Sequence, residues 1–355
     1  MTKSDILPPD LQKLLIAIGQ RLENGESVEA ALPSALAGIF ALPAATISRS
    51  APAIAEAAKL YRWRPMPAQP QKLFHLHLTE KEQLLRLPDL RYLFLFHLDG
   101  WMREAALERI SGGLHSSFLF AAVTIRLNDW AEPVRNAAFA CAKRCFPLTS
   151  ADVIAHAMTS LLPHQDSWGR WGLEREAMET ALARPDVAEQ LAGILHEART
   201  GSTSRIFRLL LKNNSIDPHL PRLAASAKQP WIRAMAVKVI ADARAGWQVG
   251  WEWRWIDKSM GQRAREPKFG FRDIQLSVDK AAVVRAAASD ASAIVRRAAL
   301  TAVIQHWRGS SDAEKLALVL KADPSPSVRE RAAFILSRIS EPIISRDAIG
   351  IRPSR

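Results

Sequence analysis

One short pattern recurs five times along this chain and limits its fold more than any other feature of the sequence. It consists of an apolar residue, an Arg, two variable residues and an Ala. The five copies begin at Met102, Val134, Ile232, Val295 and Val328, and eight residues after each lead residue stands Ile110, Ala142, Ile240, Val303 or Leu336. Apolar residues at i, i+4 and i+8 share one side of a helix, so each copy predicts a helix with one buried stripe.

The spacing of the copies predicts a repeat array. Met102 and Val134 are 32 residues apart, and Val295 and Val328 are 33 residues apart. The other two gaps, of 98 and 63 residues, are close to three and two such periods. A fixed period in this range is typical of helical repeats, each of which buries its apolar face against its neighbours. The recurring Ala suits close helix contacts, because Gly would weaken the helix and Leu would overpack it.

A turn that contains an acid or a Pro precedes the copies, and in three of them an Asp stands five residues before the Val. With these turns, the segments LNDWAEPVRNAAFACA, ASDASAIVRRAALTAV and LKADPSPSVRERAAFIL resemble HEAT repeats. The resemblance covers about residues 90–340 and implies an all-α chain, a right-handed α-solenoid of helical hairpins. HEAT arrays serve many unrelated functions, so the resemblance concerns architecture alone.

In HEAT repeats the turn acid and the Arg of the second helix tend to form a ladder of ion pairs between neighbouring repeats. The residues that match this ladder are Asp129, Arg135, Asp290, Arg296, Asp323 and Arg329. Arg103 and Arg233 match only its Arg, since His97 and Ala227 stand in the place of the acid.

The rest of the chain divides around this array. Residues 1–64 have helical periodicity and predict an N-terminal cap, and the Pro-rich residues 65–70 predict a short stiff connector. The array then spans residues 71–340, interrupted by an insertion at residues 246–276, and residues 341–355 form a C-terminal tail.

The insertion departs from helical periodicity. Trp251, Trp253 and Trp255 alternate with charged residues, and Phe269 and Phe271 repeat this alternation. A period of two residues is typical of strands, so the insertion predicts a β-hairpin or another extended excursion from the helices.

Two interpretations of the aromatic residues stay open. Aromatic rings among cations suit the stacking of single-stranded nucleic acid. Trp in an insertion more commonly packs the insertion onto its host or forms a protein interface. The candidate binding residues of the insertion are Trp251, Trp253, Arg254, Trp255, Lys258, Arg263, Arg265, Lys268 and Arg272.

Positive charge is concentrated in the second half of the chain. Residues 1–196 contain 20 Lys and Arg against 21 Asp and Glu, whereas residues 197–355 contain 28 against 15. Such asymmetry favours an acidic partner: DNA or RNA, an acidic protein face or anionic lipid. Further candidates on the helices are Arg233, Lys238, Arg244, Arg297, Arg331 and Arg338. Alternatively, these charges only solvate an exposed face.

The sequence offers little sign of an enzyme. It lacks HExxH, GxSxG, a phosphate loop and GxGxxG, and its His residues have no ligand-like spacing. Neither a metal nor a small-molecule cofactor is expected. Cys141 and Cys145 suit a helix in a reducing cytoplasm better than a disulfide framework. No apolar run is long enough for a membrane span.

The sequence therefore predicts a non-enzymatic HEAT-repeat adaptor or scaffold that binds a macromolecule, with nucleic acid the first candidate. One alternative is a scaffold that binds only protein. Another is a HEAT-like alkylpurine DNA glycosylase, a family to which the chain has a weaker resemblance and whose members use Trp and an acid on a basic surface. Adjacent acid–aromatic pairs such as Asp129–Trp130 and Trp255 with Asp257 are the basis of this second alternative.

Overall fold

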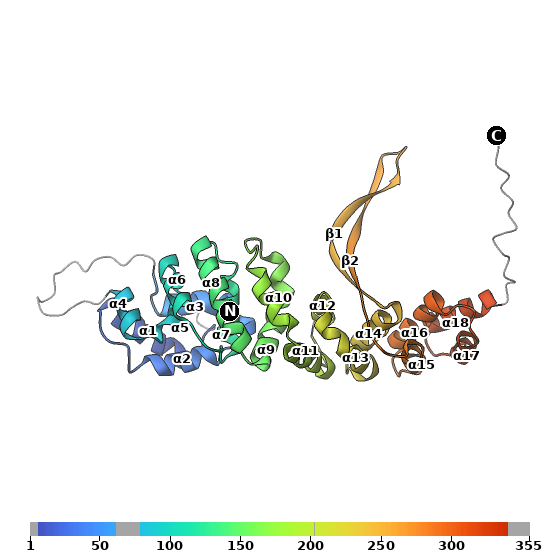
Figure 1. Ribbon diagram of the computed structural model, residues 1–355, viewed down its shortest axis with the longest axis horizontal. Coiled ribbons are helices and arrows are strands. Elements are labelled where there is room, and N and C mark those ends of the chain that lie inside the picture. The colour runs from blue at the N-terminus through green and yellow to red at the C-terminus, as the bar shows by residue number, and fades with distance from the viewer. Residues whose placement is uncertain (1–5, 62–78, 202, 340–355) are drawn as a thin grey trace, which may run out of the picture. The chain divides into compact units, whose positions relative to one another are not determined.

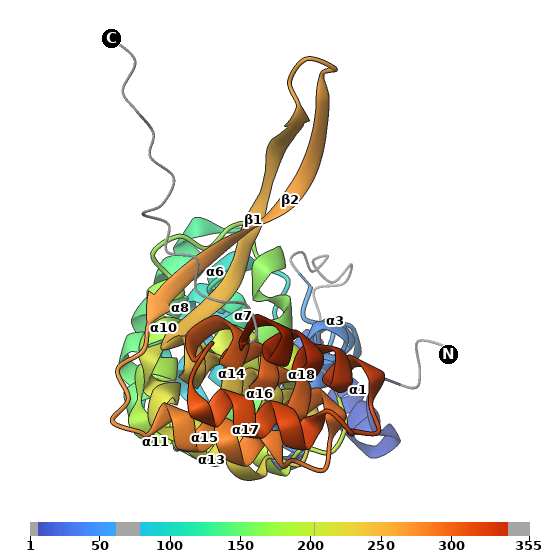
Figure 2. The ribbon, with the colours of Figure 1, turned by 90° about the vertical axis from the view of Figure 1, so that its right-hand side faces the viewer.

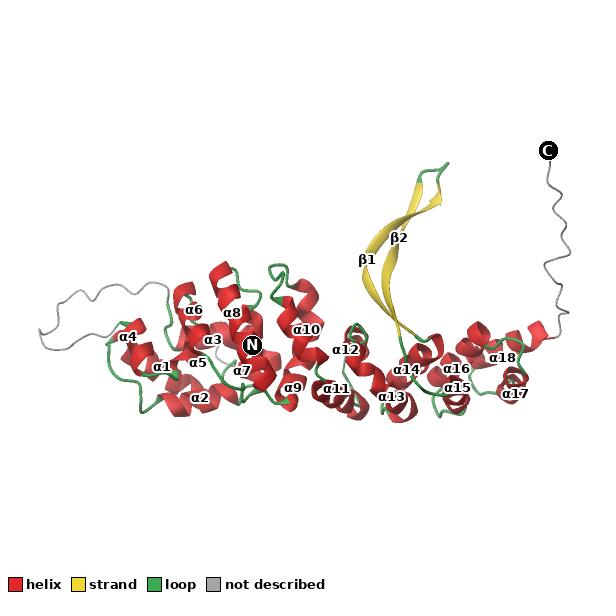
Figure 3. Cartoon of the chain, viewed as in Figure 1, coloured by secondary structure: helices red, strands yellow, loops and turns green. Residues whose placement is uncertain are grey.

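The computed structural model describes residues 6–61, 79–201 and 203–339. The expected connector at residues 65–70 and the expected tail at residues 341–355 lie outside these ranges. The described chain is mostly helical, with one two-stranded antiparallel sheet (Figure 3). It forms two compact units, residues 1–191 and residues 192–355, here called the first and the second unit.

The first unit contains short helices throughout (Figure 1). They are α1 (Pro9–Glu23), α2 (Leu32–Phe40), η2 (Ala44–Thr46), α3 (Ile47–Ala57), α4 (Glu80–Arg86), α5 (Leu90–Phe94), α6 (Gly100–Arg109), α7 (Ser117–Arg126), α8 (Glu132–Cys145), η3 (Phe146–Leu148), α9 (Ala151–Leu161), η4 (Leu162–Ser167) and α10 (Arg175–Ala183). In the expected cap, α1 packs against α2 and α3, and further along the chain α6 packs against α8. The next helix, α11 (Pro185–Glu197), crosses the boundary between the units.

The second unit consists of helix pairs and the sheet. Its elements are α12 (Thr203–Leu210), η5 (Asn214–His219), α13 (Leu220–Ser226), α14 (Pro230–Asp242), β1 (Arg244–Asp257), β2 (Gln262–Asp273), α15 (Lys280–Ala288), α16 (Ala293–His306), α17 (Ser311–Leu320) and α18 (Pro326–Ile339). Helices α13 and α14, α15 and α16, and α17 and α18 pack as pairs. Helices α14, α16 and α18 also pack side by side in that order, so they form one layer.

The recurring pattern explains how these helices pack. Each copy lies in a helix, and the Ala of every copy is fully buried: Ala106, Ala138, Ala236, Ala299 and Ala332 each expose 0% of their surface. A methyl group at these positions lets neighbouring helices approach closely without a cavity or a clash.

The Arg of the pattern connects two turns. Its Nη1 donates to a backbone carbonyl six residues earlier in all five copies, for example from Arg296 to Asp290 at 2.8 Å. In three copies the guanidinium also forms two hydrogen bonds with the Asp of a later turn: Arg103 with Asp129, Arg233 with Asp290, and Arg296 with Asp323. Each of these Asp side chains accepts a backbone amide two residues further on as well.

This geometry changes the role of one residue predicted to bind a partner. Arg233 has only 14% of its side chain exposed and holds Asp290, so it is a ladder residue. Arg135, predicted for the ladder, pairs with Glu174 at 3.2 Å. Arg329 donates to the backbone carbonyls of Asp323 and Pro324.

No single helix among the described residues is long and apolar enough to cross a membrane. Two neighbouring segments, Leu32–Phe40 and Ala44–Ala57, reach that length only together and are bent by 95°.

Candidate functional site: an aromatic hairpin and the groove at its base

Strands β1 and β2 form a long hairpin that extends away from the helices of the second unit (Figures 1 and 2). Its turn closes at Gly261, whose φ of +67° lies in the left-handed region that Gly adopts without strain. Asp257 accepts the backbone amides of Ser259 and Met260 in this turn. The insertion is therefore the β-hairpin that its alternating pattern predicts, and it begins two residues earlier than expected.

Every second residue of each strand points to the same face of this hairpin. Trp251, Trp253 and Trp255 stand opposite Pro267, Arg265 and Arg263 respectively. Along β2, Phe269 and Phe271 continue the alternation of Arg263, Arg265 and Pro267. We call the face with Trp251, Trp253, Trp255, Arg263, Arg265, Phe269 and Phe271 the aromatic face.

The side chains of the aromatic face are open to solvent. Trp251 is 55% exposed, Trp253 67% and Trp255 43%. Their rings therefore do not pack the hairpin onto the helices, whereas a protein interface, the other part of that interpretation, stays open. Guanidinium groups lie over two of the rings, Arg263 at 4.0 Å from the Trp255 centroid and Arg265 at 5.2 Å from that of Trp251. Such cation–π contacts align positive charge with the π-surface of the ring.

The opposite face of the hairpin is charged and lacks the aromatic series. Arg254 lies there, 3.3 Å from Glu266, and Lys268 stands opposite Gly250. Arg254 and Lys268, both predicted as binding residues, thus point away from the three Trp side chains. Lys258 lies in the exposed turn.

The base of the hairpin is fixed by Arg272. Its guanidinium forms two hydrogen bonds with Asp217, at 2.6 and 2.7 Å, and donates to the carbonyls of Leu211 and Asn213. Only 17% of the Arg272 side chain is exposed. Arg272, also predicted as a binding residue, is therefore an anchor that joins β2 to the segment after α12.

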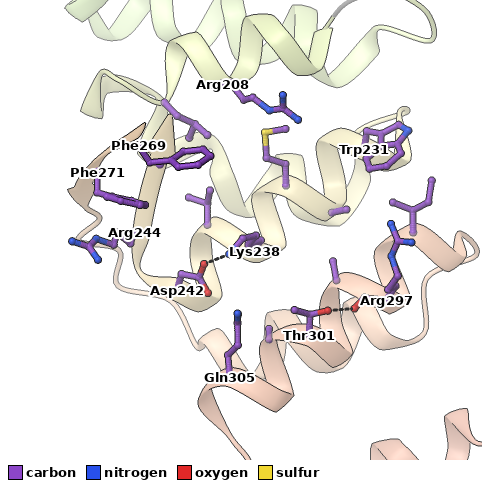
Figure 4. Close-up of a pocket in the computed structure, with 18 of the residues that line it drawn as sticks. Arg208, Trp231, Lys238, Asp242, Arg244, Phe269, Phe271, Arg297, Thr301 and Gln305 are labelled. Carbon is purple, nitrogen blue, oxygen red and sulfur yellow. Dashed lines mark hydrogen bonds and ion pairs between the residues drawn. The ribbon is translucent and has the colours of Figure 1, made fainter. Parts of the chain in front are cut away.

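A groove of about 610 Å³ lies where the hairpin meets α12, α14 and α16 (Figure 4). Phe269 and Phe271 line one side of it, and Trp231 lies at the opposite side. Apolar atoms of Met235, Val239 and Ile294 add to its walls, and the polar side chains of Gln248, Thr301 and Gln305 also line it. The aromatic face of the hairpin thus continues into this groove.

The charged groups of the groove are predominantly positive. Arg208, Lys238, Arg244 and Arg297 line it, and Asp242 is its one acidic residue. Lys238 pairs with Asp242, which also lies 2.7 Å from Nε2 of His306. Among the residues that the structure describes, Arg208 and Arg297 have neither an ion pair nor a side-chain hydrogen bond. These two guanidinium groups remain available to an anion.

The remaining predicted residues lie at the margin of the groove or away from it. Arg244 stacks on Phe271 at 4.5 Å and lies 3.8 Å from Asp273. Arg331 donates to Thr301 Oγ1 and to the Ser327 carbonyl, so it supports the wall of the groove from α18. Arg338 stacks on Phe334 at 5.5 Å, away from the groove.

The predicted binding residues lacked several that line the groove, among them Arg208, Trp231, Gln305, Phe269 and Phe271. The periodicity of the insertion already singled out the two Phe residues, and their place on the face of the three Trp residues follows from it. Arg208 and Trp231 had no local signal, because only the packing of α12 and α14 brings them to the hairpin.

The described residues hold no group of three or more His, Cys, Asp or Glu side chains arranged for a metal ion. Cys141 and Cys145 lie in α8 with their sulfur atoms 3.9 Å apart, and both are buried. Hydrogen bonding to Cys145 and burial raise the pKa of the Cys141 thiol, which opposes its reactivity as a thiolate.

Comparison with known proteins adds no further constraint. No family model matches the sequence, and no curated protein matches it.

Proposed function

We propose that this chain is a non-enzymatic α-solenoid adaptor of the HEAT type, and that its second unit binds nucleic acid through the aromatic face and the groove. The architectural part is supported by the paired helices of the second unit and by the Arg–Asp contacts between successive turns. In the first unit, Arg103 and Asp129 make the same contact with 4% and 1% of their side chains exposed.

The observation that best supports nucleic acid is the composition of the aromatic face. Three exposed Trp rings of β1 and two Arg residues of β2 lie on one side of a projecting hairpin. Bases stack on aromatic rings irrespective of sequence, and Arg residues neutralise the phosphates between them. The excess of positive charge in residues 197–355 supports an anionic partner as well.

The glycosylase alternative has less support. Asp129, one of the acids that suggested it, is held by Arg103 and Arg126 within the first unit. Asp257 is engaged by the hairpin turn. Neither Asp129 nor Asp257 is among the residues that line the groove.

The test is the affinity of the full chain for fluorescent single strands and duplexes of DNA and RNA across a salt series. Each neutralised phosphate of a single strand contributes about −0.7 to the slope of log K against log salt. Contacts through Arg208, Arg263, Arg265 and Arg297 therefore predict a slope of about −3. Absence of binding, or a slope near zero, would refute the proposal.

Two matched substitutions assign this binding to one face of the hairpin. Arg265→Ala removes a cation from the aromatic face, whereas Arg254→Ala removes the same charge from the opposite face. We expect Arg265→Ala to weaken binding and to reduce the salt slope by about 0.7, with Arg254→Ala close to the wild type. Trp253→Ala is expected to weaken binding about 5- to 150-fold through loss of stacking. Equal effects of Arg265→Ala and Arg254→Ala would remove the aromatic face from the proposal.

A second candidate function, a protein-binding scaffold, is favoured by a different surface. Trp101 and Trp130 are 77% and 61% exposed and line a small cleft of the first unit together with Glu104. Exposed Trp residues of this kind are common anchors at protein interfaces. Loss of a co-purifying protein on Trp101→Ala and Trp130→Ala substitution, with oligonucleotide affinity unchanged, would support this function.

A further inference from the structure

The groove at the base of the hairpin combines two chemistries. Its walls are aromatic and apolar, from Phe269, Phe271, Trp231 and Met235. Two guanidinium groups without a carboxylate partner, Arg208 and Arg297, also line it. A ligand that satisfies both must carry a flat or apolar ring and a negative charge.

The size and the polar lining of the groove agree with a small ring system. Its volume of about 610 Å³ lies within the range of small-molecule sites, roughly 300 to 1,000 Å³. Gln305 comes from α16 with an amide that makes no hydrogen bond among the described residues. An amide both donates and accepts, so it suits the edge of a nucleobase. Thr301 is fixed by its bonds to the Arg297 carbonyl and to Arg331.

The edges of the hairpin are poorly suited to binding a further strand. β1 contains irregularities between Gln248 and Gly250 and between Trp255 and Asp257. Pro267 of β2 lacks a backbone N–H. Bulges and Pro at edge strands oppose the addition of another strand, so a partner is expected on a face of the hairpin.

That face runs into the groove without interruption. Phe269 and Phe271 continue the alternation of Arg263, Arg265 and Pro267 along β2, and both line the groove. A chain of stacked bases on Trp255, Trp253 and Trp251 would therefore reach the groove next.

We propose that the groove binds one unstacked nucleotide of a single strand, with its base between Phe269 and Trp231 and its phosphate at Arg297 and Arg208. This inference rests on the proposed nucleic-acid function and assigns it a site and a substrate form. A duplex, whose bases are paired and stacked, cannot place one there without opening. The site therefore selects single strands over duplexes of the same sequence.

The experiment uses the full chain and three small probes. Saturation-transfer NMR follows 5′-AMP and adenosine through their ring protons, and inorganic phosphate, which has no such protons, is measured by its displacement of 5′-AMP. We expect 5′-AMP to bind through both ring and phosphate, and adenosine and phosphate to bind at least about tenfold more weakly. Equal binding of phosphate and 5′-AMP would indicate an anion site without base recognition and would overturn the inference.

Variants link the probes to the oligonucleotide. Arg297→Ala and Phe269→Ala should each weaken both 5′-AMP and single-strand binding about tenfold or more, and Arg297→Lys should recover part of the loss. Leu318→Ala on α17 and Arg285→Ala on α15 serve as controls of similar size and charge outside the groove. Circular dichroism checks that each variant is folded.

Failure of this inference differs from failure of the proposed function. If Trp253→Ala weakens single-strand binding while Arg297→Ala and Phe269→Ala leave it unchanged, the hairpin binds nucleic acid without the groove. A chain that binds duplex as tightly as single strand would also overturn the groove as an unstacked-nucleotide site. If no oligonucleotide binds, both proposals fall.

Discussion

Replacing Arg296 with Ala removes one contact between two turns of the second unit. The guanidinium donates to both carboxylate oxygens of Asp323, at 2.6 and 2.9 Å, and to the carbonyls of Asp290 and Ala291. The Asp323 side chain is 3% exposed, so its charge would remain buried with one backbone amide, from Ser325, as its partner.

The cost follows from these contacts. Loss of one partner of a buried ion pair costs about 3 to 5 kcal/mol. Arg296 keeps 13% of its side chain exposed, and water can reach the carbonyl of the exposed Ala291. We therefore expect the lower end, about 3 kcal/mol, which for a unit of this size corresponds to a fall in Tm of about 6 to 12 °C.

The neighbouring residue provides a matched control. Arg297 lies in the same helix, and its side chain makes no ion pair or hydrogen bond within the described ranges. Arg297→Ala should change stability by no more than about 0.5 kcal/mol, while it weakens nucleic-acid binding. Calorimetry of the full chain follows both variants. If Arg296→Ala lowers the Tm of the second unit no more than Arg297→Ala does, the ladder contact does not stabilise this unit.

Two further predictions concern the same carboxylates and the hairpin anchor. The pKa of Asp323 is lowered chiefly by its hydrogen bonds from Arg296. Burial alone would raise the pKa of Asp290, but the hydrogen bonds from Arg233 and the Ser292 amide, together with the charges of Arg233 and Arg296, outweigh burial and lower it. The unfolded chain therefore binds protons more readily than the folded chain. The stability from these pairs is complete above about pH 4 and is lost as pH falls through the lowered pKa. Urea unfolding should show that acid reduces the free energy of unfolding less in Asp323→Asn than in the wild type. Arg272→Ala should cost about 3 kcal/mol, because it leaves Asp217 buried without its partner, and should speed amide hydrogen exchange at the base of the hairpin. Lys268→Ala, an exposed change on the same strand, is its control, and equal exchange in the two variants would contradict the anchoring role of Arg272.

Features of the fold with a local cause could be predicted from the sequence. A spacing of apolar residues near 3.6 predicts a helix, and an alternation of every second residue predicts a strand. Both patterns can be recognised within one short segment of the sequence. The five Ala residues of the pattern are fully buried for the same reason. The role of Arg233 could not be read locally. Its partner Asp290 is 57 residues away, against 27 for Arg296 and Asp323, because the hairpin is inserted between the two turns.

The candidate site could be predicted only in part, for a related physical reason. The hairpin residues share a face through strand geometry, which the sequence determines once the register is known. The groove needs α12, α14 and α16 in their packed positions, so no local pattern marks Arg208 or Trp231. Conversely, Arg272 looks like a surface cation in the sequence, and Arg233 was predicted both to match the ladder Arg and to bind a partner. The fold pairs them with Asp217 and Asp290.

This sorting of cations strengthens the case for an anionic partner. Arg233, Arg272 and Arg296 each pair with one Asp, so each internal pair removes one positive and one negative charge and leaves the excess of the second unit unchanged. The surplus of 28 basic over 15 acidic residues in residues 197–355 must therefore reside on the other side chains, and most of the Lys and Arg side chains among those that the structure describes are exposed. A net positive charge attracts anions of any kind from solution. Which anion binds depends on where unpaired cations stand beside aromatic rings. In the second unit, unpaired cations stand beside rings on the aromatic face and in the groove. A single strand of nucleic acid carries one phosphate and one base in each nucleotide. A nucleic-acid strand offers phosphates to the Arg residues and bases to the exposed Trp rings of the same face, so this arrangement supports the proposal that the partner is a nucleic acid.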